Sequence, residues 1–118
     1  MSTPKNIEET LLWKKANELA QKIQEFRKSL PKTDMDIYAL DNKLKESVSE
    51  ISQYIEESYR SSSKLAKNKN SFLAELALLE CIDNLKKANR MKLGQANEII
   101  EDAEHFRRLL NGQQLFIL

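Results

Sequence analysis

The sequence predicts an all-α protein that folds as an antiparallel up-down-up-down four-helix bundle. The 118 residues include only two glycines and two prolines, which disfavours a β-rich or loop-rich fold. Apolar residues recur at spacings of three and four in three segments, as they do on one face of an α-helix, and a further segment is apolar nearly all round. Short polar turns separate the segments and favour antiparallel neighbours. With 41% hydrophobic and 31% charged residues, the chain is expected to form one domain over residues 1–118.

The first helix is expected over residues 5–30. Its start is indicated by Thr3 and Pro4, because threonine caps helices and proline suits the first helical position, and a start nearer Asn6 is the alternative. Pro31 ends it. The apolar stripe of this helix consists of Leu12, Ala16, Leu19, Ile23, Phe26 and Leu30.

The second helix is expected over residues 35–60. Its apolar side consists of Ile37, Leu40, Leu44, Val48, Ile51, Ile55 and Tyr59. The serines at 61–63 interrupt it, and any of them can cap the third helix, which is expected over residues 63–90.

The fourth helix is expected over residues 95–111, after a break at Gly94. Asn111 and Gly112 provide a C-terminal stop signal. The segment Leu115 to Leu118, which reads LFIL, is then an apolar tail beyond the helix. The tail either folds back onto the bundle or docks on a neighbouring subunit or another protein.

The third helix has more apolar surface than one bundle can bury. Its segment LAELALLECI, residues 73–82, is apolar at eight of ten positions, and a helix that is apolar nearly all round is buried on several sides. The surplus surface predicts a homo-oligomer. Trp13 lies beside the first stripe and either widens the core or joins a subunit contact. The interface is therefore predicted to include Trp13, Leu73, Leu76, Leu78, Leu79 and Ile82.

The formal net charge is only +1, so binding to nucleic acid requires a local basic patch. In the predicted bundle the ends of the first and third helices and the starts of the second and fourth meet at one tip. No acidic residue occurs from 84 to 97. Basic residues near helix C-termini also favourably meet the helix dipole, so a solvated surface is the alternative to an anion-binding one. The seven residues of this basic tip are Arg27, Lys28, Lys32, Lys86, Lys87, Arg90 and Lys92.

The sequence contains no recognisable catalytic constellation, and we predict no enzymatic activity, no cofactor and no metal site. There is no glycine-rich phosphate loop, nucleophile elbow or zinc-type cysteine cluster. His105 is the only histidine, and Cys81 lies in the most apolar helix as a structural thiol. The N-terminus lacks a signal-peptide h-region, and no run of eighteen apolar residues occurs. A soluble cytoplasmic protein with no membrane association is expected.

Several short motifs resemble those of a bacterial four-helix-bundle family encoded in intervening sequences of large-subunit ribosomal RNA genes. The accessory variability determinants of diversity-generating retroelements are related to that family. The similarity runs in order from about residue 7 to about residue 110. It is carried by LLWKKANELAQKI from Leu11, LPK from Leu30, Ile51 and Ile55 with Glu57, the pair Tyr59 and Arg60, and Ser71 with Glu75.

This resemblance implies a four-helix bundle assembled as a homopentamer. The retroelement proteins bind nucleic acid and a reverse transcriptase. Glu50, Tyr54 and Ser58 stand where the family typically has serine, asparagine and glycine. The leading hypothesis is a non-enzymatic homo-oligomeric bundle that binds RNA or DNA backbone through the basic tip. The alternative is a protein-interaction scaffold with no role for nucleic acid.

Overall fold

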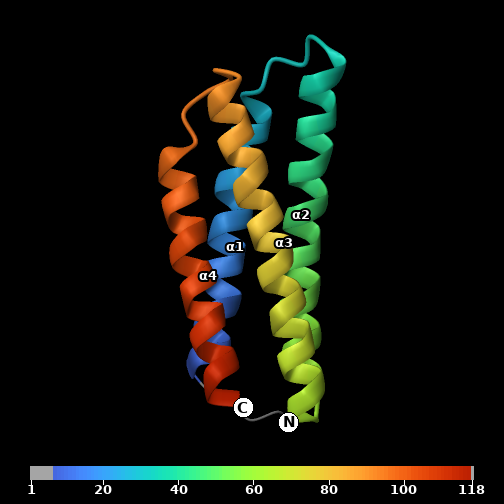
Figure 1. Ribbon diagram of the computed structural model, residues 1–118, viewed down its shortest axis with the longest axis vertical. Helices are drawn as coiled ribbons and strands as arrows, with labels where there is room; N and C mark the ends of the chain where they lie inside the picture. The colour runs from blue at the N-terminus through green and yellow to red at the C-terminus, as the bar shows by residue number, and fades with distance from the viewer. Residues whose placement is uncertain (1–6, 118) are drawn as a thin grey trace.

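This computed structural model describes residues 7–117 of the chain, and the side chains of residues 11–112. The described part of the chain folds into four α-helices. The helices are α1 (Ile7–Lys28), α2 (Met35–Arg60), α3 (Lys64–Arg90) and α4 (Asn97–Ile117). They run alternately up and down, and no strand occurs between residues 7 and 117 (Figure 1). The predicted fold class is confirmed.

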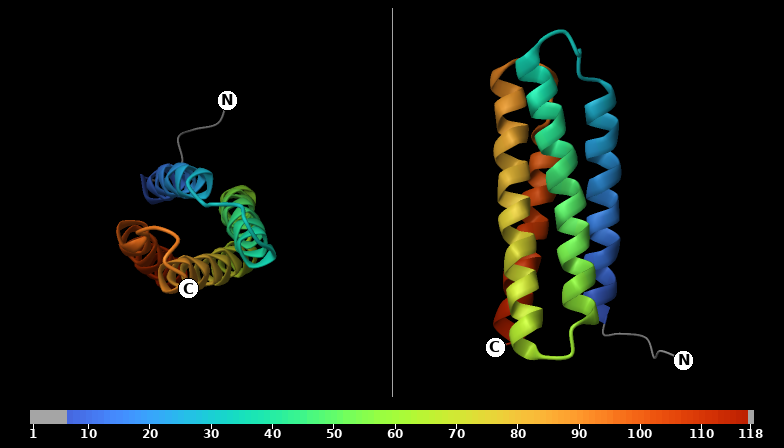
Figure 2. Two further views of the ribbon diagram at one scale, coloured as in Figure 1. Left: turned by 90° about the horizontal axis from the view of Figure 1, so that it is seen from above. Right: turned by 90° about the vertical axis from the view of Figure 1, so that its right-hand side faces the viewer.

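Each helix packs against its neighbours in chain order, and α4 closes the bundle against α1. Figure 2, seen from above, shows α1 diagonally across from α3. The pairing of α2 with α3 is the most extensive, and that of α1 with α4 is the least. The bundle is elongated, with extents of 48 × 27 × 21 Å.

The core consists of the apolar stripes, and the predicted stripe of the first helix is confirmed completely. Its buried members are Leu12, Ala16, Leu19, Ile23, Phe26 and Leu30. The second helix differs in detail, because Ser47 is fully buried while Val48 is only partly so and Tyr59 is 37% exposed. Ser47 Oγ has no hydrogen-bond partner within the described residues. Many of the residues that α3 buries in the core are small, such as Ala74, Cys81 and Ala88.

Two helices begin at side-chain caps. The Asp34 carboxylate accepts a hydrogen bond from the Ile37 amide at 3.1 Å, and Ser63 Oγ accepts one from the Ala66 amide at 3.0 Å. Each cap satisfies a backbone donor that the first turn of a helix leaves free. The prediction that one of the three serines caps the third helix is confirmed, with Ser63 as the cap.

The first helix ends at Lys28, two residues before the predicted end. Leu30 precedes Pro31, and the proline ring disfavours helical geometry at the residue before it. Leu30 nevertheless stays buried at 4% exposure, because the turn after α1 folds it back over the end of the core.

The third helix ends in a Schellman motif. The Leu93 amide donates to the Ala88 carbonyl at 3.1 Å, and the Lys92 amide donates to the Asn89 carbonyl at 3.0 Å. The left-handed position of this motif, usually glycine, is occupied by Lys92 with φ of 58°. Gly94 has φ of 151°, and a Cβ there would lie 3.2 Å from Phe26 Cε1.

The predicted end of the fourth helix is wrong. The helix continues past Asn111 and Gly112 to Ile117. Glycine in a helix interior costs about 1 kcal/mol relative to alanine, and the following glutamines and leucine are good helix formers, so one glycine does not end the helix. Residues 115–117 therefore belong to α4, and Leu118 lies outside the described residues.

Within residues 7–117, none of the helices combines the length and the apolar character needed to cross a membrane.

Candidate nucleic-acid interface

The seven residues of the basic tip lie at one end of the bundle. The C-terminal ends of α1 and α3 and the N-terminal ends of α2 and α4 meet there, at the upper end of Figure 1. Turns 29–34 and 91–96 cross this end. The arrangement follows from the alternating direction of the helices, but the seven cations differ in what they contact.

Arg27 is engaged within the bundle. Its Nε donates to Asp41 Oδ1 at 2.8 Å and its Nη2 donates to Asp41 Oδ2 at 3.3 Å, so the pair is bidentate. The Arg27 side chain is 19% exposed and that of Asp41 is 10% exposed. Such a pair fixes the end of α1 against the start of α2. The assignment of Arg27 to the binding surface is therefore not supported, because Asp41 and Gln24 already accept three of its five N–H donors.

Lys28 and Lys32 are held less firmly by contacts within the bundle than Arg27 is. Lys28 Nζ lies 3.6 Å from Glu25 Oε1, and both side chains are about three-quarters exposed. Exposed pairs of this kind contribute little to stability, and a ligand can replace them. Lys32 Nζ donates to the Arg27 carbonyl at 3.1 Å, and the same carbonyl accepts from the Leu30 amide at 3.2 Å.

The remaining four cations form what we call the α3 cluster, which consists of Lys86, Lys87, Arg90 and Lys92. All four are exposed. None has an ion pair or a side-chain hydrogen bond within the described part of the chain. At about 100° per residue, Lys86, Lys87 and Arg90 span an arc of about 100° on α3, so they face solvent together.

The α3 cluster has the chemistry of a surface for phosphate groups. Three lysine ammonium groups offer point charges with several N–H donors, and the Arg90 guanidinium matches phosphate oxygens in bidentate geometry. No acid occurs from 84 to 97, and Asp83 is the nearest carboxylate on α3. The cluster can therefore bind a polyanion without first breaking an ion pair.

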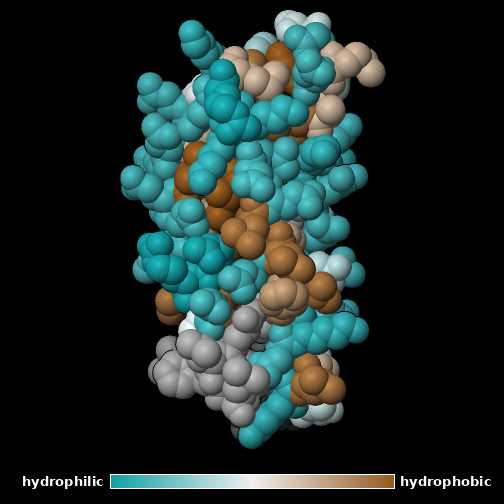
Figure 3. Space-filling model, in the orientation of Figure 1, coloured by the Kyte–Doolittle hydropathy of each residue, from teal (hydrophilic) through white to brown (hydrophobic). Residues whose placement is uncertain are grey.

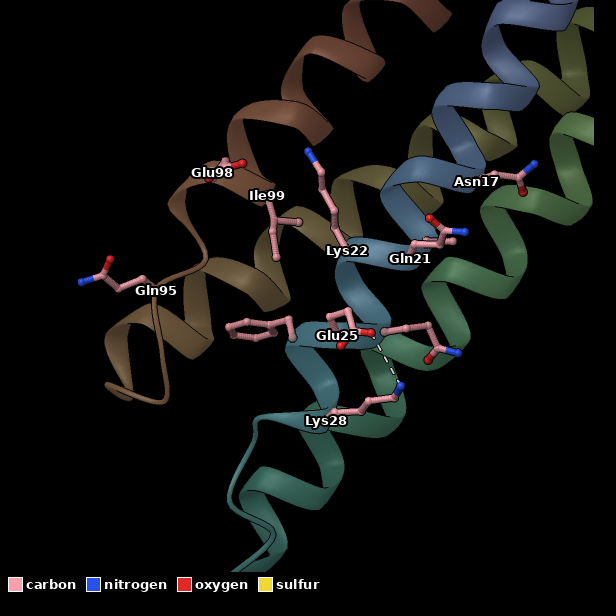
Figure 4. Close-up of a pocket in the computed structure, with 11 residues that line it drawn as sticks. Asn17, Gln21, Lys22, Glu25, Lys28, Gln95, Glu98 and Ile99 are labelled. Carbon is pink, nitrogen blue, oxygen red and sulfur yellow. Dashed lines mark ion pairs between the residues drawn. The ribbon is translucent and has the colours of Figure 1, made fainter.

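A groove between α1 and α4 begins at the same end of the bundle. It is open, with a volume of about 1120 Å³, and Figure 4 shows Lys22, Glu25 and Lys28 on one side and Glu98 and Ile99 on the other. The two glutamates of its lining balance the two lysines, so the groove has no net charge to attract an anion. We therefore do not include the groove in the candidate anion-binding surface.

Farther along this groove, Lys22 forms an ion pair with Asp102 that joins α1 to α4. The hydrogen bond to Asp102 raises the pKa of the Lys22 amine above its ordinary value of 10.5. This link supports the least extensive helix pairing of the bundle.

The predicted oligomer interface divides into three parts. Leu78 and Ile82 are 0% and 2% exposed, so their assignment to the interface is wrong, because they pack in the core of their own bundle. Leu76 and Leu79 are 45% and 37% exposed, and Leu73 beside them is partly exposed. Trp13 is 41% exposed, but it lies on α1, which is diagonally across the bundle from α3 (Figure 2).

Two exposed apolar residues of α3 were not among the predicted ones. Leu65 is 81% exposed and Phe72 is 51% exposed. The signal that finds them is periodicity, because Leu65, Phe72 and Leu79 are seven residues apart. Because nearly every residue from 73 to 82 is apolar, this second periodicity is hard to detect in the sequence alone.

Over the described residues, no group of three or more histidine, cysteine, aspartate and glutamate side chains is arranged to hold a metal ion. His105 is exposed on α4, and Cys81 is fully buried in α3.

Comparisons with protein-family models, with curated proteins and with solved structures found no match.

Proposed function

We propose that this protein is a non-enzymatic helical bundle that binds the phosphate backbone of RNA or DNA through the α3 cluster. The observation that carries the proposal is the exposure of four cations with no ion-pair partner within the described residues, inside a segment, residues 84–97, that contains no acid. Binding of this kind recognises charge and spacing and not base sequence. A cytoplasmic location is part of the proposal.

The resemblance to the family of ribosomal RNA intervening sequences is compatible with this function and stays a prediction, as does the homopentamer that it implies. A homo-oligomer would multiply the α3 cluster, and affinity for phosphate rises steeply with the number of cations. The proposal itself requires only one chain.

The test is charge reversal of the cluster. We expect the triple variant Lys86→Glu, Lys87→Glu, Arg90→Glu to lose binding to a labelled RNA hairpin and to a DNA duplex in fluorescence anisotropy at low salt. Three of the four proposed phosphate contacts are lost and three repulsive charges are added. Glutamate near a helix C-terminus also opposes the dipole. A second variant with glutamine at the same three positions therefore keeps the test valid if the first one unfolds.

The matched control carries the same change in net charge at scattered sites. Lys14, Lys45 and Lys64 are exposed and lie outside the basic tip, so the variant Lys14→Glu, Lys45→Glu, Lys64→Glu should retain most of the binding. An equal loss of affinity in the two glutamate triple variants would mean that binding depends on net charge alone and not on the α3 cluster. Full binding by the cluster variants would refute the proposal.

The exposed apolar face of α3 favours a second candidate function, a protein-interaction scaffold in which nucleic acid has no part. Phe72, Leu76 and Leu79 give this face an apolar centre, and exposed apolar patches of this kind mark interaction sites. The scaffold is favoured if the purified protein binds neither RNA nor DNA while Leu76→Glu abolishes an interaction with another protein.

A further inference from the structure

The third helix has two apolar stripes on opposite sides. Its core stripe includes Leu78, Cys81 and Leu85, all 0% exposed. The outer stripe consists of Leu65, Phe72, Leu76 and Leu79, whose exposed fractions range from 81% to 37%. At about 100° per residue, the outer stripe lies within about 60° of arc, on the side of α3 opposite the core stripe. Figure 3 shows hydrophobic side chains gathered along α3 on the face in view.

The outer stripe has the spacing of a coiled-coil seam. Lys69 precedes Phe72 by three residues and Asp83 follows Leu79 by four. Positions 65, 69, 72, 76, 79 and 83 therefore alternate spacings of four and three, as the a and d positions of heptads do. A seam of this kind is complementary to a second helix with the same pattern, which makes a second copy of the chain the natural partner.

The charges at the two ends of the seam determine the direction of pairing. Lys69 and Asp83 are exposed, and neither has an ion pair within the described residues. In a parallel pair, Lys69 would face Lys69 and Asp83 would face Asp83 of the second copy, and Arg90 would also meet its own counterpart. In an antiparallel pair, Lys69 of each copy lies within about one turn of Asp83 of the other. Opposite charges therefore favour the antiparallel pair.

We propose that α3 pairs with α3 of a second copy in antiparallel orientation, with Phe72 of each copy facing Leu76 of the other. Leu79 then covers the stem of Lys69, and Leu73 lies beside the two-fold axis. This inference is independent of nucleic-acid binding. It places the two α3 clusters at opposite ends of the assembly, about 40 Å apart from one Lys87 to the other at about 1.5 Å per residue.

The pair is expected to be reversible. Four apolar residues and two ion pairs are fewer than those of an interface that buries about 800 Å² on each partner. At concentrations of tens to hundreds of micromolar, light scattering after size exclusion should approach twice the 13.7 kDa of one chain, and the mass should fall on dilution.

Leu76→Glu should give a monomer, because it places a carboxylate at the centre of the apolar seam. Leu76 is already 45% exposed, so the fold should persist, which circular dichroism checks. The matched control is Tyr38→Glu, since Tyr38 is 50% exposed on α2 and lies outside the seam. The control should still dimerise. The antiparallel dimer is an alternative to the homopentamer that the family resemblance implies. A wild-type monomer at hundreds of micromolar, that homopentamer, or a dimer that survives Leu76→Glu would overturn the proposal.

A charge swap tests the direction of pairing separately. Lys69→Asp and Asp83→Lys should each weaken the dimer, because each places like charges together across the seam. The double variant Lys69→Asp, Asp83→Lys should restore it. In a parallel pair every variant would still set like charges side by side, so the absence of rescue would rule out the antiparallel arrangement.

Discussion

The buried position of Cys81 determines the protonation state and the reactivity of its thiol. Its side chain is 0% exposed, and burial raises the pKa of the thiol to about 12 from an ordinary value of 9.0. The thiolate is the reactive form, so the native thiol is both shielded and protonated at neutral pH.

We predict that native protein at pH 8 reacts with a thiol reagent at least about a hundredfold more slowly than unfolded protein, because reaction requires opening of the core. Ellman's reagent with and without denaturant measures this. Since the folded pKa is raised, the stability contributed by this thiol is complete below pH 9 and is lost as the pH rises toward 12. Rapid reaction of the native protein would contradict the buried position.

At the same scale, sequence predicts which residues are apolar and periodic but not which charges pair. The stripe from Leu12 to Leu30 could be predicted because its period matches a single buried face. Arg27 could not be excluded from the basic tip, because its partner Asp41 lies fourteen residues away on another helix. Leu78 and Ile82 could not be separated from Leu76 and Leu79, since a nearly continuous apolar run does not reveal which side faces the core.

At the scale of the elements, the four helices follow from periodicity, whereas their ends depend on turn chemistry. The predicted break at Gly94 is confirmed, because Gly94 lies in the turn between α3 and α4, although the left-handed residue at the end of α3 is Lys92. The predicted stop at Gly112 is wrong, because α4 continues through it. The Schellman hydrogen bonds and the partly buried Leu93 hold Lys92 in place. A non-glycine residue in this conformation costs about 1–2 kcal/mol.

We therefore predict that Lys92→Gly raises the free energy of unfolding by about 1 kcal/mol, after allowance for the greater flexibility of glycine in the unfolded chain. Thermal or urea unfolding measures the change. Lys92→Ala is the matched control, since it removes the same charge but keeps a Cβ, and it should bring no such gain. Equal stability of the two variants would mean that the backbone at this position is not strained.

At the scale of the whole molecule, alternating helix direction brings the end of α3 to the tip that α1, α2 and α4 share. Sequence was sufficient to predict this juxtaposition, because short turns leave few alternatives. It was not sufficient to show that Arg27 and Lys28 of α1 have ion pairs while Lys86, Lys87, Arg90 and Lys92 have none among the described residues. The binding surface that we propose is therefore the α3 cluster and not the whole basic tip.

If two copies pair through α3, the assembly presents two such clusters, one at each end. A polyanion long enough to reach both would bind more tightly than a short one, because the second contact becomes intramolecular. This difference would disappear in Leu76→Glu, which keeps the cluster and removes the pairing.

The most direct test of the central claim is the dependence of binding on salt, measured by fluorescence anisotropy with a short duplex that one cluster can span. Four phosphate contacts predict that log K falls with log salt at a slope of about −3 to −4, and that the slope shrinks to about −1 when Lys86, Lys87 and Arg90 are replaced by glutamine. Binding with a slope near zero, or with the same slope in the variant, would contradict recognition of the backbone by the α3 cluster.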